Sequence, residues 1–300
     1  MKVGFIGQGY IGKNYANDFE NRGYEVVRYA LEKEYNGNKD KIKDCDVVFI
    51  AVPTPSTPKG FDDSIVRSVV KFVGKGKTAV IKSTMVVGTT ESIQKENPDV
   101  FVMHSPEFLT EARAPQDAAA PNRNIIGIPK DTKEYKKKAQ EVLDILPKAP
   151  YETIVTAKEA EFIKYAGNNW FYFKVVFVNM LFDLAQKHEI DWEVIKNGMA
   201  ADPRIGSSHL QVVHASGKKS KKELDFNDFH LEPRHKGGRG AGGHCFIKDF
   251  AAFEEMYKKY VGDDELGQSV LEALRKKNND LLKSTDKDLD ILKGVYGKDV

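Results

Sequence analysis

A glycine-rich turn near the start of the chain sets the strongest constraint on its fold. Gly7, Gly9 and Gly12 form the pattern G-x-G-x-x-G, which follows a buried-strand pattern at 3–6 and opens a helical pattern. In such a unit the first glycine permits the tight turn, the second lets the backbone approach a pyrophosphate, and the third allows close helix–strand packing. The free N–H groups at the helix start favour the phosphates. The alternative is a glycine turn without a ligand in some other α/β protein. The expected dinucleotide site comprises Gly7, Gln8, Gly9, Tyr10, Ile11 and Gly12.

Short apolar runs alternate with helical patterns over the first half of the chain. The expected strands are 3–6, 26–29, 47–51, 78–81, 101–103 and 124–128, with 151–155 as a last strand. The expected helices between them include 11–21, 64–73, 89–96 and 132–146. Strands that alternate with helices predict a parallel sheet covered on both faces, so we expect an α/β chain with an N-terminal Rossmann-type domain at 1–155.

The second half is predicted to be helical. From 156 to about 189 there is no proline and a single glycine, and apolar residues recur at helical spacing. This pattern predicts one helix of roughly 45–50 Å at 1.5 Å per residue, and its apolar circumference favours burial between domains or subunits. Further helices are expected at 192–199, 249–260 and 264–282, with an irregular segment at 209–243. We therefore expect a helical substrate and dimerisation domain at 156–300.

Composition bounds the classes of partner. Lys and Arg number 46 against 44 Asp and Glu, which gives no general case for nucleic acid or an anionic membrane surface. The longest apolar runs have the length of a strand, and the chain starts on a strand pattern without a signal-peptide layout. The two cysteines show no framework spacing, which suits a reducing compartment. We expect a cytoplasmic protein that binds neither nucleic acid nor a membrane.

The adenosine end of the dinucleotide site is less regular. An acidic residue that binds the ribose is expected at the end of the second strand, and Glu32 is the nearest candidate. Arg28 has two interpretations, a contact to a 2′-phosphate or a structural role within the strand. NAD is favoured over NADP.

Six further segments carry a resemblance to a known family. They are AVPTP at 51–55, KSTMVVGTT at 82–90, SPEFLTE at 105–111, EFIKYAGN at 161–168, DPRIG at 202–206 and GAGGHCFIKD at 240–249. Together and in this order they resemble the nucleotide-sugar dehydrogenases, typified by UDP-glucose 6-dehydrogenase. The resemblance implies NAD-dependent oxidation of a sugar primary alcohol to a carboxylate, with UDP-glucose to UDP-glucuronate as the expected reaction.

This reaction needs a nucleophile in the protein. Removing four electrons at one site means two hydrides and one water, and an aldehyde donates a hydride poorly until a nucleophile adds to its carbonyl. The resemblance places Cys245, held in the glycine-rich turn 240–243, as that nucleophile, through a thiohemiacetal and a thioester. The alternative for a lone intracellular cysteine is a buried, inert thiol.

The resemblance also implies the remaining catalytic residues. Lys164 and Asn168 lie one helical turn apart, where a cation and an amide donor stabilise an oxyanion, although a helical lysine is otherwise a solvated residue. Glu107 is a candidate base for thioester hydrolysis, Thr84 is expected to hold the water, and Asp249 is expected to act on the water or orient Lys164. The choice of base between Glu107 and Asp249 stays open. No metal is expected.

The expected binding residues complete the site. Beside the glycine turn, the cofactor residues are Val52, Pro53, Thr54, Ser83, Thr84, Glu111 and Lys248. The substrate residues are Glu107, Phe108, Leu109, Glu111, Lys164, Asn168, Arg204, Gly240 and Gly242. Arg204 matches a family arginine that reaches the substrate of the neighbouring subunit, which implies a homodimer with shared sites. Solvation at the surface is the alternative for Glu111.

The chain departs from the family pattern in three places. We expect it to lack the family's third domain, which binds the UDP portion, because 283–300 is too short for another α/β domain. The segment 32–44 is abbreviated, and 211–238 is an insertion. Its lysines, with Arg234 and Arg239, either replace pyrophosphate contacts or belong to a solvated loop.

Three other functions compete. A one-step dehydrogenase resembling the β-hydroxyacid and 6-phosphogluconate enzymes would need no thiol. A metal site is suggested by five histidines near Cys245, although tight ligand pairs are missing. A nucleotide-binding protein without catalysis is the third. The histidines are His209, His214, His230, His235 and His244.

Overall fold

The computed structural model describes residues 1–219 and 235–300, and these form two compact units. The first unit comprises Met1–Pro55 and Asp62–Lys164, and the second comprises Ser56–Phe61 and Tyr165–Val300. The second unit thus takes in a small hairpin from the first half of the chain, formed by β4 (Ser56–Thr57) and β5 (Gly60–Phe61). The expected domains 1–155 and 156–300 stay a prediction, and the units differ from them in this hairpin and at 156–164.

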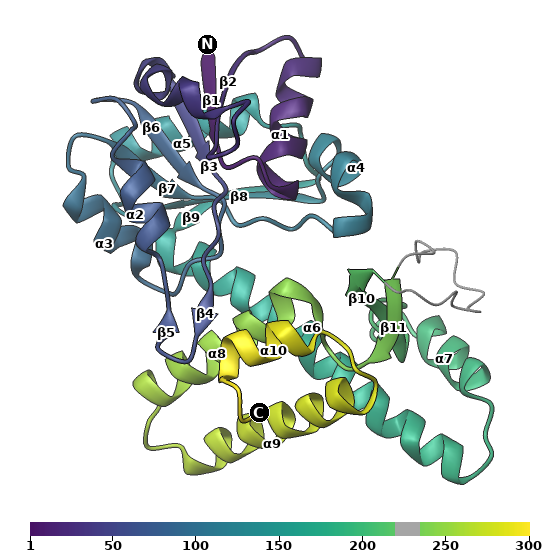
Figure 1. The fold of residues 1–300 in the computed structure, drawn as a ribbon. Helices are drawn as coiled ribbons and strands as arrows, with labels where there is room; N and C mark the ends of the chain where they lie inside the picture. The colour runs from purple at the N-terminus through teal and green to yellow at the C-terminus, as the bar shows by residue number, and fades with distance from the viewer. Residues whose placement is uncertain (220–234) are drawn as a thin grey trace. The chain divides into compact units, whose positions relative to one another are not determined.

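A seven-stranded sheet forms the centre of the first unit, in the order β2-β1-β3-β6-β7-β8-β9 (Figure 1). The strands are β1 (Lys2–Ile6), β2 (Glu25–Tyr29), β3 (Val47–Ile50), β6 (Thr78–Ile81), β7 (Phe101–His104), β8 (Arg123–Ile128) and β9 (Tyr151–Thr156). Because β1 lies between β2 and β3, the strand order reverses at the glycine turn, where ligands of open α/β sheets bind. The expected α/β Rossmann-type fold is confirmed.

One feature of the sheet differs from the expected parallel arrangement. β8 runs antiparallel to β7 and parallel to β9. The connection from β7 to β8 carries only the 3-10 turn Glu111–Arg113 and the short helix α4 (Ala114–Ala119). An antiparallel neighbour can be joined without a crossover helix, whereas the parallel step from β8 to β9 carries α5 (Lys133–Ile145).

The sheet of the first unit is held by apolar strands and by helices on its faces. All residues of β3 and β6 are buried. Phe5 of β1 stacks on Phe49 of β3 at 5.2 Å between ring centroids, and Phe19 of α1 packs edge-on against Phe5 at 5.3 Å. Such aromatic packing fixes the first helix directly behind the glycine turn. The other elements are α1 (Tyr10–Asn21), the 3-10 helix Asn36–Asp44, α2 (Ser64–Val70) and α3 (Thr89–Glu96).

The long helix of the second half is present as α6 (Ala157–Lys187), with 31 residues. Tyr172 of α6 stacks on Phe250 at 3.9 Å between ring centroids and joins α6 to α8. α8 (Gly243–Tyr260) begins six residues earlier than expected, so Cys245 lies in its first turn instead of in a turn before the helix. α10 was not predicted from the sequence. The remaining helices are α7 (Trp192–Ala201), α9 (Glu265–Ser284) and α10 (Leu289–Tyr296).

The segment expected to be irregular contains an antiparallel strand pair, β10 (Val213–Lys219) and β11 (His235–Arg239). β11 has the sequence HKGGR, which shows no apolar alternation, so its partner strand determines its conformation. The inserted lysines Lys221 and Lys222 and the neighbouring Arg234 lie outside the described residues.

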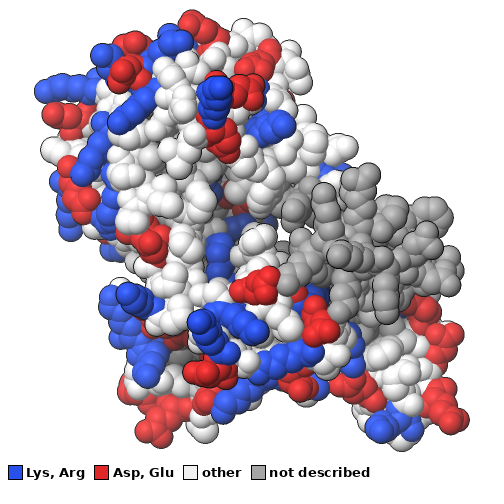
Figure 2. All heavy atoms as spheres, viewed as in Figure 1, with Lys and Arg blue, Asp and Glu red and all other residues white. Residues whose placement is uncertain are grey.

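Where charged side chains appear on the face drawn in Figure 2, basic and acidic ones are interspersed. In the described parts of the chain, no helix has both the length and the apolar character that crossing a membrane requires.

Candidate functional site

The glycine turn has the geometry that a bound pyrophosphate needs. Gly7 has a φ of +90°, and a Cβ atom there would collide with the carbonyl of Ala51. A Cβ atom on Gly12 would collide with the carbonyl of Gly7, so both glycines are required by the chain itself. A Cβ atom on Gly9 would meet nothing within 4 Å, and α1 starts after Gly9 without a side-chain cap. The turn therefore leaves space at the start of α1, and a helix start is where backbone N–H groups bind phosphates.

The loops after β3 and β6 are joined beside this turn. The hydroxyl of Ser83 accepts from the N–H of Val52 at 3.0 Å and donates to the carbonyl of Val52 at 2.7 Å. The hydroxyl of Thr54 donates to the carbonyl of Thr84 at 2.9 Å. Five expected cofactor residues, including the exposed Pro53, are thus gathered at the carboxyl end of the sheet. Their contact to the cofactor stays a prediction.

Arg28 is fully engaged within the first unit. Its guanidinium pairs with Glu20 at 2.6 Å and donates to Asn17 at 2.8 Å and to Gln8 of the glycine turn at 3.3 Å. These bonds favour the structural interpretation of Arg28 over a contact to a 2′-phosphate. Glu32 is exposed after β2.

Glu107 and Lys164 meet in the first unit. The ammonium of Lys164 donates to the backbone carbonyl of Glu107 at 2.5 Å, and the carboxylate of Glu107 accepts from the N–H of Leu109. Both side chains are buried. Burial raises the pKa of Glu107, against the opposing effect of Lys164 and Lys82. A carboxylate with a raised pKa is suited to accept a proton near neutral pH.

The loop after β7 places two further expected residues. The ring of Phe108 lies under the guanidinium of Arg123, 3.7 Å from its centroid, and 5.6 Å from the ammonium of Lys164. Cation–π contacts of this kind fix the ring in place. The side chain of Glu111 lies outside the described part of the structure.

Lys82 belongs to this buried group, although sequence reasoning assigned it no role. It follows β6, is 4% exposed, and donates to the hydroxyl of Ser105 at 3.0 Å. Its ammonium lies 4.5 Å from the centroid of the Tyr15 ring. Burial lowers the pKa of Lys82 to about 8, while Glu107 acts in the opposite direction. Its position directly after a buried strand was the available signal, because such residues lie at the carboxyl edge of the sheet.

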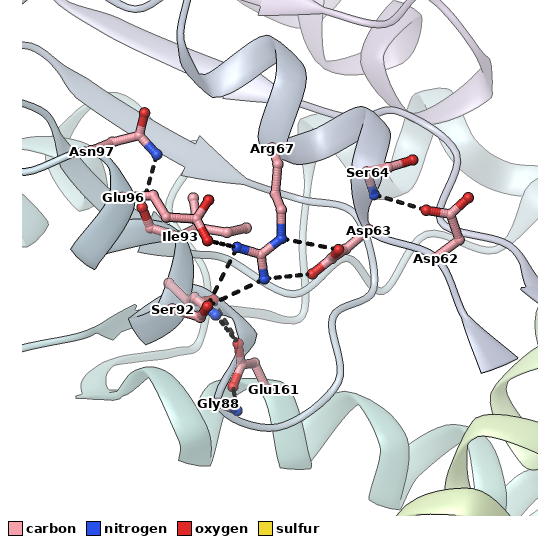
Figure 3. Close-up of polar contacts among 11 residues, drawn as sticks. Asp62, Asp63, Ser64, Arg67, Gly88, Ser92, Ile93, Glu96, Asn97 and Glu161 are labelled. Atoms are coloured by element: carbon pink, nitrogen blue, oxygen red, sulfur yellow. Dashed lines mark hydrogen bonds and ion pairs between the residues drawn. The ribbon is translucent and has the colours of Figure 1, made fainter.

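Glu161 holds the start of α3 (Figure 3). Its carboxylate accepts from the N–H of Gly88 at 2.6 Å and from the N–H and hydroxyl of Thr90 at 2.7 and 2.6 Å. Burial raises the pKa of Glu161 to about 7, although these hydrogen bonds favour the ionised form. The loop that begins at Thr84 is thereby anchored at its far end.

A second anchor of α3 also appears in Figure 3. The guanidinium of Arg67 on α2 pairs with Asp63 at 2.9 Å, donates to the hydroxyl of Ser92 at 3.3 Å, and pairs with Glu96. These contacts join α2 to α3 and support the loop held by Glu161.

Cys245 shares a helix of the second unit with two other expected residues. Lys248 and Asp249 lie one turn after Cys245 on α8, and their side chains pair at 2.5 Å. Asn168 of α6 donates its amide to the second carboxylate oxygen of Asp249 at 2.5 Å. Burial acts to lower the pKa of Lys248, but Asp249 and Cys245 outweigh it, so this pKa lies above its ordinary value. A cation of this kind favours the thiolate form of a neighbouring cysteine.

The expected substrate residues Gly240 and Gly242 are constrained by the chain itself. Gly240 has a φ of +89°, and its missing Cβ atom would lie 3.0 Å from the Asn278 amide oxygen. A Cβ atom on Gly242 would collide with the carboxylate of Asp288. Packing therefore explains both glycines, and a contact to substrate stays a prediction.

Arg204 lies on the surface of the second unit. Its guanidinium pairs with Asp202 at 2.6 Å, and its side chain is 88% exposed. Such an exposed pair adds little stability, so Arg204 can exchange Asp202 for another anion at small cost.

The histidines that lie near Cys245 in the sequence are the candidate metal ligands. His230 and the side chain of His235 lie outside the described part. Within it, no three His, Cys, Asp or Glu side chains gather closely enough to hold a metal ion. Burial lowers the pKa of His209 to about 4 and that of His214 to about 3, so both are neutral at physiological pH.

Comparison with known sequences places these features in a family. Residues 30–146 match the NAD binding domain, and residues 158–226 the central domain, of the UDP-glucose/GDP-mannose dehydrogenase family. UDP-glucose 6-dehydrogenase YwqF of Bacillus subtilis is 30% identical over 267 residues, which cover 85% of this chain and 53% of the relative. A UDP-glucose 6-dehydrogenase of Rhizobium meliloti is 33% identical over 298 residues, covering 84% and 62%. The chain thus spans little more than half the length of these curated relatives.

Two solved structures share the fold. A UDP-glucose dehydrogenase from Pyrobaculum islandicum has a TM-score of 0.72 at 24% identity, covering 93% of this chain and 68% of its own. The 3-hydroxyisobutyrate dehydrogenase of Mycobacterium tuberculosis has a TM-score of 0.67 at 14% identity, covering 97% of both chains. The domain matches bear out NAD as the cofactor expected from the glycine turn, and the chain belongs to the UDP-glucose/GDP-mannose dehydrogenase family.

Proposed function

We propose that this chain is an NAD-dependent dehydrogenase that oxidises the primary alcohol of a sugar nucleotide to a carboxylate in two steps. One observation carries the proposal: Cys245 lies in the first turn of α8, and the next turn bears Lys248 and Asp249, with Asp249 bonded to Asn168. A one-step oxidation has no use for a thiol beside a cation, whereas a four-electron oxidation needs a covalent catalyst.

The first step removes two electrons from the alcohol. NAD, held at the glycine turn, supplies the hydride acceptor for both steps. Lys164 and Asn168, one turn apart on α6, stabilise the oxygen of the sugar carbon as its proton leaves. The product of this step is the aldehyde.

The second step requires covalent bonding. The sulfur of Cys245 adds to the aldehyde carbon to give a thiohemiacetal, and loss of the second hydride leaves a thioester. Water then adds to the thioester carbonyl, its proton passes to a base, and the thiolate leaves as the carboxylate forms. Both carboxylate oxygens of Asp249 already accept hydrogen bonds, from Asn168 and Lys248, whereas burial raises the pKa of Glu107. We therefore assign the base to Glu107, with Thr84 holding the water.

The expected substrate is UDP-glucose, oxidised to UDP-glucuronate. This choice is supported by relatives that carry the name UDP-glucose 6-dehydrogenase. The test is a panel of UDP- and GDP-linked hexoses with NAD, followed by the absorbance of the reduced cofactor. Two reduced cofactors per molecule of substrate support the proposal.

The alternatives give different outcomes in the same assay. A one-step dehydrogenase of the β-hydroxyacid type, favoured only by the fold likeness to 3-hydroxyisobutyrate dehydrogenase, yields one reduced cofactor and stays active as Cys245→Ala. A nucleotide-binding protein without catalysis binds NAD and reduces none with any sugar nucleotide.

We further propose a homodimer through an exposed apolar stripe on α6. The stripe consists of Trp170, Phe173, Phe177, Met180 and Leu184, which are 40–61% exposed. An apolar face of this length favours an interface with a second copy, which would bring Arg204 to the neighbouring site. Sedimentation velocity tests the dimer. Mixing the inactive variants Arg204→Ala and Cys245→Ala tests the shared site, because mixed dimers regain part of the activity.

A further inference from the structure

One short segment of the second unit binds the backbone of the turn that precedes Cys245. Lys287 donates its ammonium to the carbonyl of Gly240 at 2.8 Å. The carboxylate of Asp288 accepts from the N–H of Gly243, the first residue of α8, at 2.7 Å. Asn278 of α9 bonds both backbone groups of Ala241, accepting from its N–H at 2.7 Å and donating to its carbonyl at 3.0 Å.

The partners in these contacts are almost completely shielded from solvent. Asn278 and Asp288 are 1% exposed, and Lys287 is 2% exposed. Buried charges are costly unless they are paired and hydrogen-bonded, and here the bonds that compensate Lys287 and Asp288 go to the backbone around the start of α8. Burial lowers the pKa of Lys287 to about 8, with Asp288 acting in the opposite direction. Asp288 also adopts a left-handed backbone with a φ of +53°, which only a few residue types tolerate.

The two charges bracket the start of the helix that bears the thiol. The ammonium of Lys287 binds the turn five residues before Cys245, and the carboxylate of Asp288 binds the helix two residues before it. A positive charge near a cysteine stabilises its thiolate, and a negative charge at the helix N-terminus counteracts the helix dipole. A charge at either of these positions would therefore be expected to influence the thiol, with opposite sign for Lys287 and Asp288.

We propose that Asn278, Lys287 and Asp288 are positioning residues for Cys245, with Asn278 fixing the turn and the Lys287–Asp288 pair setting the reactivity of the thiol. The inference rests on the proposed role of Cys245 as nucleophile. Other titratable groups of the second unit lie beside this site. They are Lys248, which interacts with Cys245, its neighbours His244 and Asp249 on α8, and His214 on β10, which interacts with Lys287.

The test measures the alkylation rate of Cys245 by iodoacetamide in the whole chain without substrate. Peptide mass spectrometry separates this signal from that of the buried Cys45. Lys287→Met should slow alkylation at pH 7 about threefold, and Asp288→Asn should speed it about threefold. Asn tolerates the left-handed backbone and keeps an acceptor for Gly243. Asn278→Ala changes no charge, so it should lower kcat at least about tenfold while the pH midpoint of alkylation stays in place.

Controls separate charge from loosened structure. Lys283→Met removes an exposed lysine from the end of α9 and should alkylate as wild type does. Lys287→Arg keeps the charge, so its alkylation rate should stay within about twofold of the wild-type rate.

If Lys287→Met does not fold, the isosteric Asp288→Asn carries the test. Rates that move in the same direction in both charge variants, or do not move, overturn the inference. Rates that move as predicted in a chain that oxidises no sugar nucleotide uphold the inference and overturn the proposed function.

Discussion

Asn168 of α6 donates its side-chain amide to a carboxylate oxygen of Asp249 on α8 at 2.5 Å, and Lys248 occupies the other oxygen at 2.5 Å. The carboxylate thus orients two donors at once. The hydrogen bonds to Asp249 fix the rotamers of Asn168 and Lys248. Without these bonds each side chain could adopt other rotamers, and its amide or ammonium would no longer point toward a substrate.

Asp249→Asn should lower kcat at least about a hundredfold with a smaller change in KM, because an amide pairs poorly with the ammonium of Lys248 and alters the orientation of Asn168. Steady-state kinetics of reduced-cofactor formation measure both parameters. The matched control is Asp263→Asn, which removes an exposed carboxylate of the same unit and should leave both unchanged. A wild-type kcat in Asp249→Asn would contradict this role.

Lys82→Met should move the pH dependence of thioester hydrolysis upward. The positive charge of Lys82 lowers the pKa of Glu107, so removing it lets burial raise that pKa further and the carboxylate forms only at higher pH. The pH midpoint of kcat then rises, and acylated Cys245 accumulates at neutral pH in acid-quenched samples analysed by mass spectrometry. Lys77→Met, which removes a half-exposed partner of Asp46, is the control. If the pH dependence of kcat stays as in wild type, Lys82 does not influence the pKa of Glu107.

Local patterns explain which parts of the fold could be predicted. The strand–turn–helix unit at the start of the chain follows from neighbouring residues, because Gly12 avoids a clash with Gly7 and Gly9 leaves an opening within the same turn. The direction of β8 could not be predicted, since the connection from β7 is long enough for either orientation and the packing of the sheet decides between them. The early start of α8 was missed because Gly243 is a weak helix former, and its N–H is held by a carboxylate 45 residues away.

The same distinction applies to the candidate site. Cys245, Lys248 and Asp249 could be placed together because they are neighbours in the sequence, although the helix that they share was expected to begin only at 249. The roles of Lys82 and Asn278 could not be recognised from the sequence, because each depends on a contact to a distant residue, 23 positions away for Lys82 and 37 for Asn278. Composition does not reveal whether a lysine or asparagine is buried.

Glu161 should make the stability of the chain depend on pH. Its pKa in the folded state, about 7, lies above the ordinary value of 4.5, so folding favours the protonated form. The contribution of Glu161 to the stability of the folded chain is therefore fully present below pH 4.5 and is lost as the pH rises through 7. The shift corresponds to about 3 kcal/mol in the free energy of unfolding. Urea unfolding at several pH values measures it.

Glu161→Gln should flatten this dependence between pH 4.5 and 7, because the amide does not ionise. The overall stability falls as well, since an amide donor then faces the N–H groups of Gly88 and Thr90, so only the slope is diagnostic. Glu159→Gln, an exposed neighbour on the same helix, should keep the slope of the wild type. An unchanged slope in Glu161→Gln would place the titrating group elsewhere.

Gly9→Ala and Gly12→Ala should separate cofactor binding from folding at the glycine turn. A methyl group on Gly9 meets nothing within 4 Å, so Tm should stay within about two degrees of the wild-type value. NAD affinity should fall at least about tenfold, because the methyl group occupies space beside the phosphates. A methyl group on Gly12 collides with the carbonyl of Gly7, so Tm and NAD affinity should fall together. Calorimetry measures Tm and titration calorimetry measures the affinity. If Gly9→Ala binds NAD as tightly as wild type does, the pyrophosphate does not lie over the second glycine.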